Sequence, residues 1–176
     1  MRSYLEPIKE DVFKETVNIR FNDINQGFSN FINGILEVDE KSSIEDDFEE
    51  RFINFYKKVY EKNEVITDFY LKDIDETGVL KILEGLDYQD RLIILNELKY
   101  GDKTTLYFKI KDENIIRTIV SLSFRELLFC TTYFLGKDIT IWGNYSRRFP
   151  VFFKDEEIIK EYKIIAKSCG LKISDY

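Results

Sequence analysis

Apolar residues recur with helical spacing through the N-terminal third of the chain. Pro7 suits the first turn of a helix, where its missing N–H would have no partner in any case. From Phe21 to Ile35, apolar side chains return at positions i, i+3, i+7, i+10 and i+14, with asparagines on the opposite side. Gly27 and Gly34 weaken this pattern by about 1 kcal/mol each relative to alanine. The period nevertheless predicts a core helix.

A further helix is predicted after residue 42. Ser42 and Ser43 are each followed three residues later by an acidic residue, which is the signature of a capping box. An apolar stripe with helical spacing comes next, at Phe48, Phe52, Phe55 and Val59. Carboxylates crowd the first turns and lysines the last, which complements the helix dipole. The N-terminal third is therefore predicted to be helical.

Beyond Asn63 the apolar period shortens to two in several segments, which indicates strands. The predicted strands are residues 65–71, 106–110, 127–135, 139–142 and 148–153. Helices are predicted at 76–83, from the cap Asp87 to Gly101, at 113–125, and from the cap Asp155 to Gly170. The second of these helices carries the apolar residues Tyr88, Leu92, Leu95 and Leu98.

These elements predict an α+β fold. The last three strands follow one another too closely for crossover connections, so the sheet should be antiparallel or mixed. Pro150 cannot donate to a ladder, which places the strand 148–153 at an edge. A chain of 176 residues is close to one domain in length. We predict a single α+β domain over residues 1–176, with a helical N-terminal third followed by a small antiparallel or mixed sheet packed with helices.

The net charge of −7 is concentrated in one stretch. Between Glu37 and Glu50 there are eight carboxylates and one lysine, and we call this stretch the acidic segment. Its carboxylates are Glu37, Asp39, Glu40, Glu45, Asp46, Asp47, Glu49 and Glu50. They could cap and solvate a helix, or they could meet a basic protein partner. An acidic chain without a basic cluster argues against nucleic-acid binding and against docking on anionic membranes.

The chain contains no histidine, which removes Ser-His-Asp and Cys-His catalysis and the HExxH zinc site. Cys130 lies in an apolar run, where burial makes a thiol inert. Cys130 and Cys169 show no CxxC spacing, so reduced thiols and a cytoplasmic location are expected, with a disulfide between them left open. No segment has the apolar length of a membrane span. We predict no metal and no cofactor, and the chemistry leans away from an enzyme.

One short motif points to an enzyme. The sequence Asp73-Ile-Asp75-Glu-Thr77 follows a predicted strand. It resembles the start of the haloacid-dehalogenase phosphotransferases, which implies a nucleophile at Asp73, a general acid at Asp75 and bound magnesium. The resemblance covers about seven residues. The structural alternative is that Asp75 caps the helix that begins at Glu76.

The predicted hairpin after residue 139 has an unusual tip. It shows the residues Trp142, Asn144, Tyr145, Arg147 and Arg148. Aromatic faces and guanidinium groups suit a phosphate or carboxylate ligand, and they also anchor protein interfaces. The structural alternative is a loop in which Trp142 packs on a neighbouring helix.

Together these observations favour a non-catalytic intracellular protein that acts by binding a protein partner. Toxin-neutralising immunity proteins and adaptors offer an analogy of class. In this hypothesis the acidic segment meets a basic partner, with electrostatic steering. The first alternative is a domain that binds a small anionic or nucleotide-like ligand at the 142–148 tip. The second is a magnesium-dependent phosphotransferase at Asp73 and Asp75. The oligomeric state is not predicted.

Overall fold

A computed structural model describes residues 3–45 and 47–175. The strands are β1 (Leu5–Ile8), β2 (Ile32–Val38), β3 (Glu64–Asp68), β4 (Tyr107–Ile110), β5 (Thr131–Leu135), β6 (Ile139–Trp142), β7 (Phe149–Phe153) and β8 (Leu171–Ser174). The helices are α1 (Glu10–Thr16), α2 (Ile24–Asn30), α3 (Phe48–Tyr60), α4 (Glu76–Gly85), α5 (Tyr88–Tyr100), α6 (Asn114–Phe124) and α7 (Glu156–Ser168). Two short 3-10 helices, η1 (Leu71–Asp73) and η2 (Tyr145–Arg147), complete the described elements.

Across these residues the strands form one antiparallel sheet in the order β1-β4-β3-β5-β6-β7-β2-β8. The α+β class and the antiparallel sheet are confirmed. The sheet is larger than expected, because β1 and β2 come from the N-terminal third and β8 follows the last helix. No helix in the described ranges has the length and apolar character that a membrane span requires.

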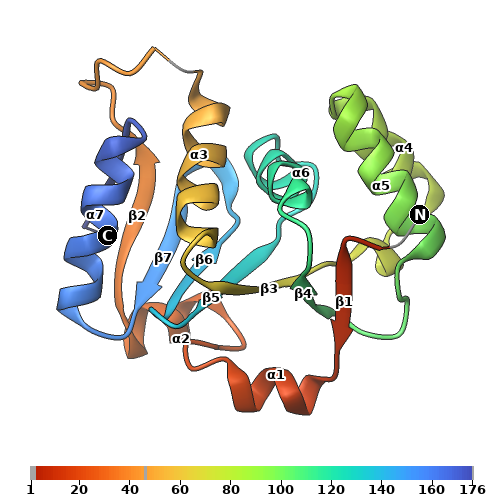
Figure 1. Cartoon of the computed structure of the whole chain (residues 1–176), viewed down its shortest axis with the longest axis horizontal. Coiled ribbons are helices and arrows are strands. Elements are labelled where there is room, and N and C mark those ends of the chain that lie inside the picture. Colours follow the sequence, from red (N-terminus) through yellow and green to blue (C-terminus); the bar gives the residue numbers. More distant parts are fainter. Residues whose placement is uncertain (1–2, 46, 176) are drawn as a thin grey trace.

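Helices cover both faces of the sheet (Figure 1). Helices α3 to α7 lie on one face, where the main core contains large side chains such as Phe52, Phe149 and Phe153. Helices α1 and α2 lie on the opposite face, and there Phe13 stacks on Tyr107 with ring centroids 3.6 Å apart. The alternation of strand residues between the faces therefore serves two cores.

The predicted helix from Phe21 to Ile35 is wrong in its second half. Helix α2 ends at Asn30, and strand β2 begins at Ile32. Gly34 shows the reason: a Cβ atom there would lie 2.7 Å from Ile173 Cγ2 and 2.8 Å from the Ser174 carbonyl oxygen. The strand is thus fixed by its close approach to β8, and tertiary pairing overrides the helical period.

Two other N-terminal boundaries differ from expectation. Pro7 lies in β1, opposite Phe108, instead of in the first turn of a helix. At the edge of the sheet its missing N–H leaves no ladder bond unmade. Helix α3 begins after Asp47, whose side chain accepts from the Glu50 N–H at 2.9 Å. Ser42 instead accepts a hydrogen bond from the Ile44 N–H in the preceding loop.

The placement of β7 at an edge is also wrong. Strand β7 lies between β6 and β2. Pairing with β6 stops at Val151, so Pro150 has a ladder partner, Ile35, on the β2 side only. A proline is tolerated in this internal strand because the β6 ladder has already ended.

Candidate functional site

The tip residues predicted from the sequence are divided between two surroundings. Trp142 is partly buried and stacks on Phe21, with ring centroids 5.5 Å apart. Tyr145 remains 63% exposed. Arg147 points away from both, with its guanidinium 4.6 Å from the centroid of the Phe124 ring. The alternative in which Trp142 packs against a neighbouring segment is therefore correct for Trp142 itself, but this packing does not bury the whole tip.

An open groove of about 450 Å³ lies beside the tip. Its lining residues are Ile24, Phe28, Ile35, Trp142, Asn144, Tyr145, Ser146, Arg148 and Pro150. The structure thus brings four of the five predicted tip residues to one groove, with Arg147 excluded. Ser146 and Arg147 both have left-handed backbones, with φ of 59° and 56°. Such conformations cost energy in non-glycine residues and concentrate at binding sites.

The acidic segment is largely tied down within the chain. Glu37 receives hydrogen bonds from Ser174 at 2.9 Å and Arg148 at 2.9 Å, and it lies 3.4 Å from Lys172. Partial burial opposes ionisation, but these partners hold the pKa of Glu37 below its ordinary value. Asp39 accepts from the Lys41 N–H, whereas Glu40 and Glu45 are exposed. Asp46 lies outside the described residues.

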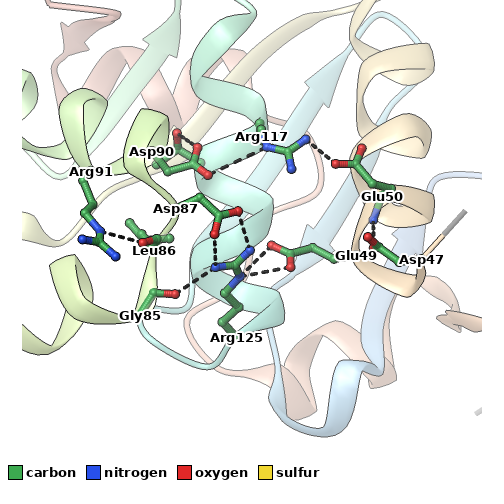
Figure 2. A network of polar contacts seen from close by, with 11 residues as sticks. Asp47, Glu49, Glu50, Gly85, Leu86, Asp87, Asp90, Arg91, Arg117 and Arg125 are labelled. Carbon is green, nitrogen blue, oxygen red and sulfur yellow. Dashed lines mark hydrogen bonds and ion pairs between the residues drawn. The ribbon is translucent and has the colours of Figure 1, made fainter.

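Glu49 and Glu50 are not the solvated face that adjacent helical carboxylates predict. Figure 2 shows Glu50 pointing at Arg117 of α6 and Glu49 pointing at Arg125, the residue that follows α6. Arg125 Nε contacts the two oxygens of Glu49 at 2.9 and 3.0 Å, and its Nη2 lies 3.0 Å from Asp87 Oδ2. The same guanidinium donates to the Gly85 carbonyl at 2.9 Å. These bonds join α3, α6 and the α4–α5 pair.

A second arginine, in the middle of α6, makes a similar connection (Figure 2). Arg117 pairs with Glu50, and its Nε lies 3.9 Å from Asp90 Oδ2. Asp90 is 1% exposed, and its Oδ1 accepts from the Thr118 hydroxyl at 2.6 Å. We call the six charged residues of these two sets of contacts the arginine network: Glu49, Glu50, Asp87, Asp90, Arg117 and Arg125. It fixes the position of α5 relative to the rest of the helical layer.

Three of the four apolar residues noted above for this helix form an exposed stripe on α5. Tyr88, Leu92 and Leu95 are 68%, 44% and 47% exposed, and we call these three residues the α5 stripe. They occupy positions i, i+4 and i+7, so they share one helix face. Ile94, on the other side, is fully buried. The sequence did hold a signal, since α5 has more apolar residues than one buried face requires.

The Asp73–Asp75 motif has a structural role at Asp75. Its Oδ1 accepts from the Gly78 N–H at 2.8 Å, so the predicted cap of α4 is confirmed. Asp73 is exposed at the end of η1. Among the residues described, no three His, Cys, Asp or Glu side chains gather as a metal site would need.

Two buried titratable groups lie near one another at the centre of the sheet. Asp68 is 4% exposed and accepts from the Thr131 N–H at 2.6 Å. Burial raises the pKa of Asp68 to about 7, although bonds from Thr131 and Tyr70 oppose the rise. Burial also raises the pKa of the Cys130 thiol well above its ordinary value. Cys130 is buried, as its apolar run predicts, and Cys130 and Cys169 are both free thiols.

Comparison with known proteins gives no family for this chain. No family model matches it, and no curated protein or solved structure shows significant similarity.

Proposed function

We propose that this protein acts by binding another protein through the outer face of α5. The observation that supports the proposal is the α5 stripe, three large apolar side chains that share one helix face and remain 44–68% exposed. Leu80, on the preceding helix, is 60% exposed as well. Clustered apolar exposure of this kind is typical of protein interaction sites, whereas isolated exposed leucines are not.

The charges of α5 indicate the chemistry of the partner. Its two carboxylates, Asp90 and Glu97, are 1% and 5% exposed, whereas Arg91 and Lys99 are exposed. The outer face is therefore apolar and cationic, although the chain as a whole is acidic. A complementary partner presents an apolar patch with carboxylates at its rim.

A second copy of this chain is a poorer occupant. Two α5 helices packed antiparallel about Leu95 would bring Arg91 of one copy towards Lys99 of the other. Like charges placed across an interface oppose association. We therefore assign the α5 stripe to a different protein.

The acidic segment is the weaker contact surface for this function. Glu37, Glu49 and Glu50 already have cationic partners within the chain. A basic partner would have to compete with those ion pairs. Among the described residues of the segment, the exposed carboxylates are Glu40, Glu45 and Asp47, and Asp47 caps α3. Two free, buried thiols support the cytoplasm as the place of action.

Substitution of Leu92 by aspartate tests the proposal. The tagged full chain captures proteins from a lysate of the source organism, and the protein identified by mass spectrometry is then purified and titrated by calorimetry. We expect Leu92→Asp to weaken its binding by at least about 30-fold, because a carboxylate would replace an apolar contact and face an acidic rim. Arg91→Ala should slow association at low salt.

The control is Val12→Asp, on α1 and on the opposite face of the sheet. Val12 is 44% exposed, as Leu92 is, so both variants place a charge at an equally open position. Val12→Asp should bind within about twofold of the wild type. Equal affinity of Leu92→Asp and the wild type would contradict the proposal. A dimer in light scattering that Leu92→Asp dissociates would assign the stripe to a second copy.

The groove at the tip supports a second candidate, the binding of a small anionic or nucleotide-like ligand. Trp142 offers a partly exposed aromatic face and Arg148 a guanidinium at the rim of the same groove. Adenosine monophosphate should then raise the melting temperature in a saturable way. Arg148→Ala should abolish the rise, whereas Arg147→Ala should keep it because Arg147 lies outside the groove. No rise at millimolar nucleotide would rule this candidate out.

A further inference from the structure

A second cavity lies beneath α5, on the side away from the stripe. It encloses about 190 Å³ between the C-terminal end of α5, β1 and β4, and the segment that follows β3. Its apolar lining consists of Leu5, Phe69, Leu71, Ile74, Leu98 and Phe108. The exposed residues Asp102 and Lys103 lie at the mouth, and their opposite charges balance. This volume exceeds the roughly 150 Å³ of an apolar cavity that holds a benzene ring.

One wall of the cavity carries a buried carboxylate. Glu97 is 5% exposed; its Oε2 accepts from the Ser3 hydroxyl at 2.7 Å and its Oε1 from the Tyr4 N–H at 2.8 Å. Asn96 Nδ2 lies 3.3 Å from the same Oε1. All three donors are neutral, and among the side chains that the structure describes no cationic group forms an ion pair with Glu97. A buried carboxylate is ordinarily matched by a cation.

The chain keeps the space beside this carboxylate open. Gly101 follows α5 and lines the cavity. A Cβ atom at Gly101 would lie 2.5 Å from the Glu97 carbonyl oxygen and 3.1 Å from its Oε2. Any other residue would therefore crowd the carboxylate on the side of the cavity.

We propose that this cavity binds a small primary amine with an aromatic or branched apolar body. The ammonium group is held by Glu97, and the apolar body fills the chamber lined by Phe69 and Phe108. A cation supplies the positive charge that the three neutral donors lack, and an apolar body of about eight carbon atoms suits a cavity somewhat larger than the one that holds benzene. The site is separate from the α5 stripe and does not depend on the proposed function.

Three ligands that share a phenyl ring on a two-carbon chain and differ in the charge of the end group test the proposal on the wild-type chain. These are 2-phenylethylamine, the neutral 2-phenylethanol and the anionic 3-phenylpropionate, titrated by calorimetry and by thermal shift at neutral pH. We expect saturable binding of the amine, at least about tenfold weaker binding of the alcohol and none of the acid. Binding of amine and alcohol with equal affinity, or no binding of the amine at millimolar concentration, would overturn the proposal.

The variant Glu97→Gln tests whether Glu97 causes the preference for the amine over the alcohol. It keeps the shape and the acceptor oxygen, and we expect it to remove the preference for the amine. Glu84→Gln, at an exposed position of α4, is the matched control and should bind as the wild type does. If Glu97→Gln does not fold, the three-ligand comparison still decides the question, because it needs no variant.

Discussion

Replacement of Asp68 by asparagine is expected to stabilise the protein at pH 8 far more than at pH 4. Burial raises the folded-state pKa of Asp68 from 3.8 to about 7. A raised pKa means that the folded state holds its proton more tightly than the unfolded chain. Stability is therefore fully present below about pH 4 and is lost as the pH rises through 7. About three pKa units correspond to about 4 kcal/mol of unfolding free energy.

Asparagine suits this site because its amide oxygen can accept from the Thr131 N–H without carrying a charge. The titratable groups that interact electrostatically with Asp68 are Tyr70, Tyr107, Tyr133 and Cys130. Each has a raised pKa and stays neutral between pH 4 and pH 8. Urea unfolding at pH 4, 6 and 8 should show the difference between variant and wild type growing with pH. Asp11→Asn, an exposed control, should give a small and constant difference. A constant difference for Asp68→Asn would contradict the account.

Replacement of Arg125 by leucine is expected to lower the free energy of unfolding by about 2–4 kcal/mol. The change leaves Glu49, whose side chain is 15% exposed, without the Nε–H that both of its oxygens share, and it removes a donor to the Gly85 carbonyl. A partly buried carboxylate that loses its partner lowers the free energy of unfolding by more than an exposed ion pair raises it. Denaturant unfolding at neutral pH measures the loss.

Lys14→Leu provides the control for this prediction. Lys14 forms an exposed i,i+4 ion pair with Glu10, in which the two side chains are 59% and 67% exposed. Its loss should change stability by about 0.5 kcal/mol or less. Arg125→Lys keeps the positive charge but loses the several N–H donors of the guanidinium. Its free energy of unfolding should therefore lie between those of Arg125→Leu and the wild type. Similar losses for Arg125→Leu and Lys14→Leu would show that the arginine network does not hold α5 in place.

The sequence predicted those elements that are determined by neighbouring residues, such as helices with a capping side chain. The caps at Asp75 and Asp155 both accept the expected backbone hydrogen bonds, and α6 lies within the predicted range 113–125. Strands β2 and β8 depend instead on each other. Gly34 reads as a helix weakener in sequence, whereas in space it is the position where β8 approaches most closely. Pairing between residues some 140 positions apart leaves no periodic trace.

The candidate sites show the same division. The tip residues were visible in the sequence because turn residues, tryptophan and arginine are concentrated there. Their convergence with Phe28 and Ile35 into a groove requires the sheet order. The exposure of the α5 stripe was not predicted, because helical spacing alone does not say which of two apolar faces a neighbouring element covers. Glu97 gave no signal, since a lone glutamate in a helix is ordinarily exposed.

Hydrogen–deuterium exchange of the full chain, with and without the captured partner, tests the central claim most directly. It reports on three surfaces in one experiment: α5, the acidic segment and the hairpin tip. We predict slower exchange over residues 88–100, with residues 37–50 and 142–148 unchanged. Protection of 37–50 or 142–148 while 88–100 exchanges as in the free protein would contradict the claim that α5 is the binding face.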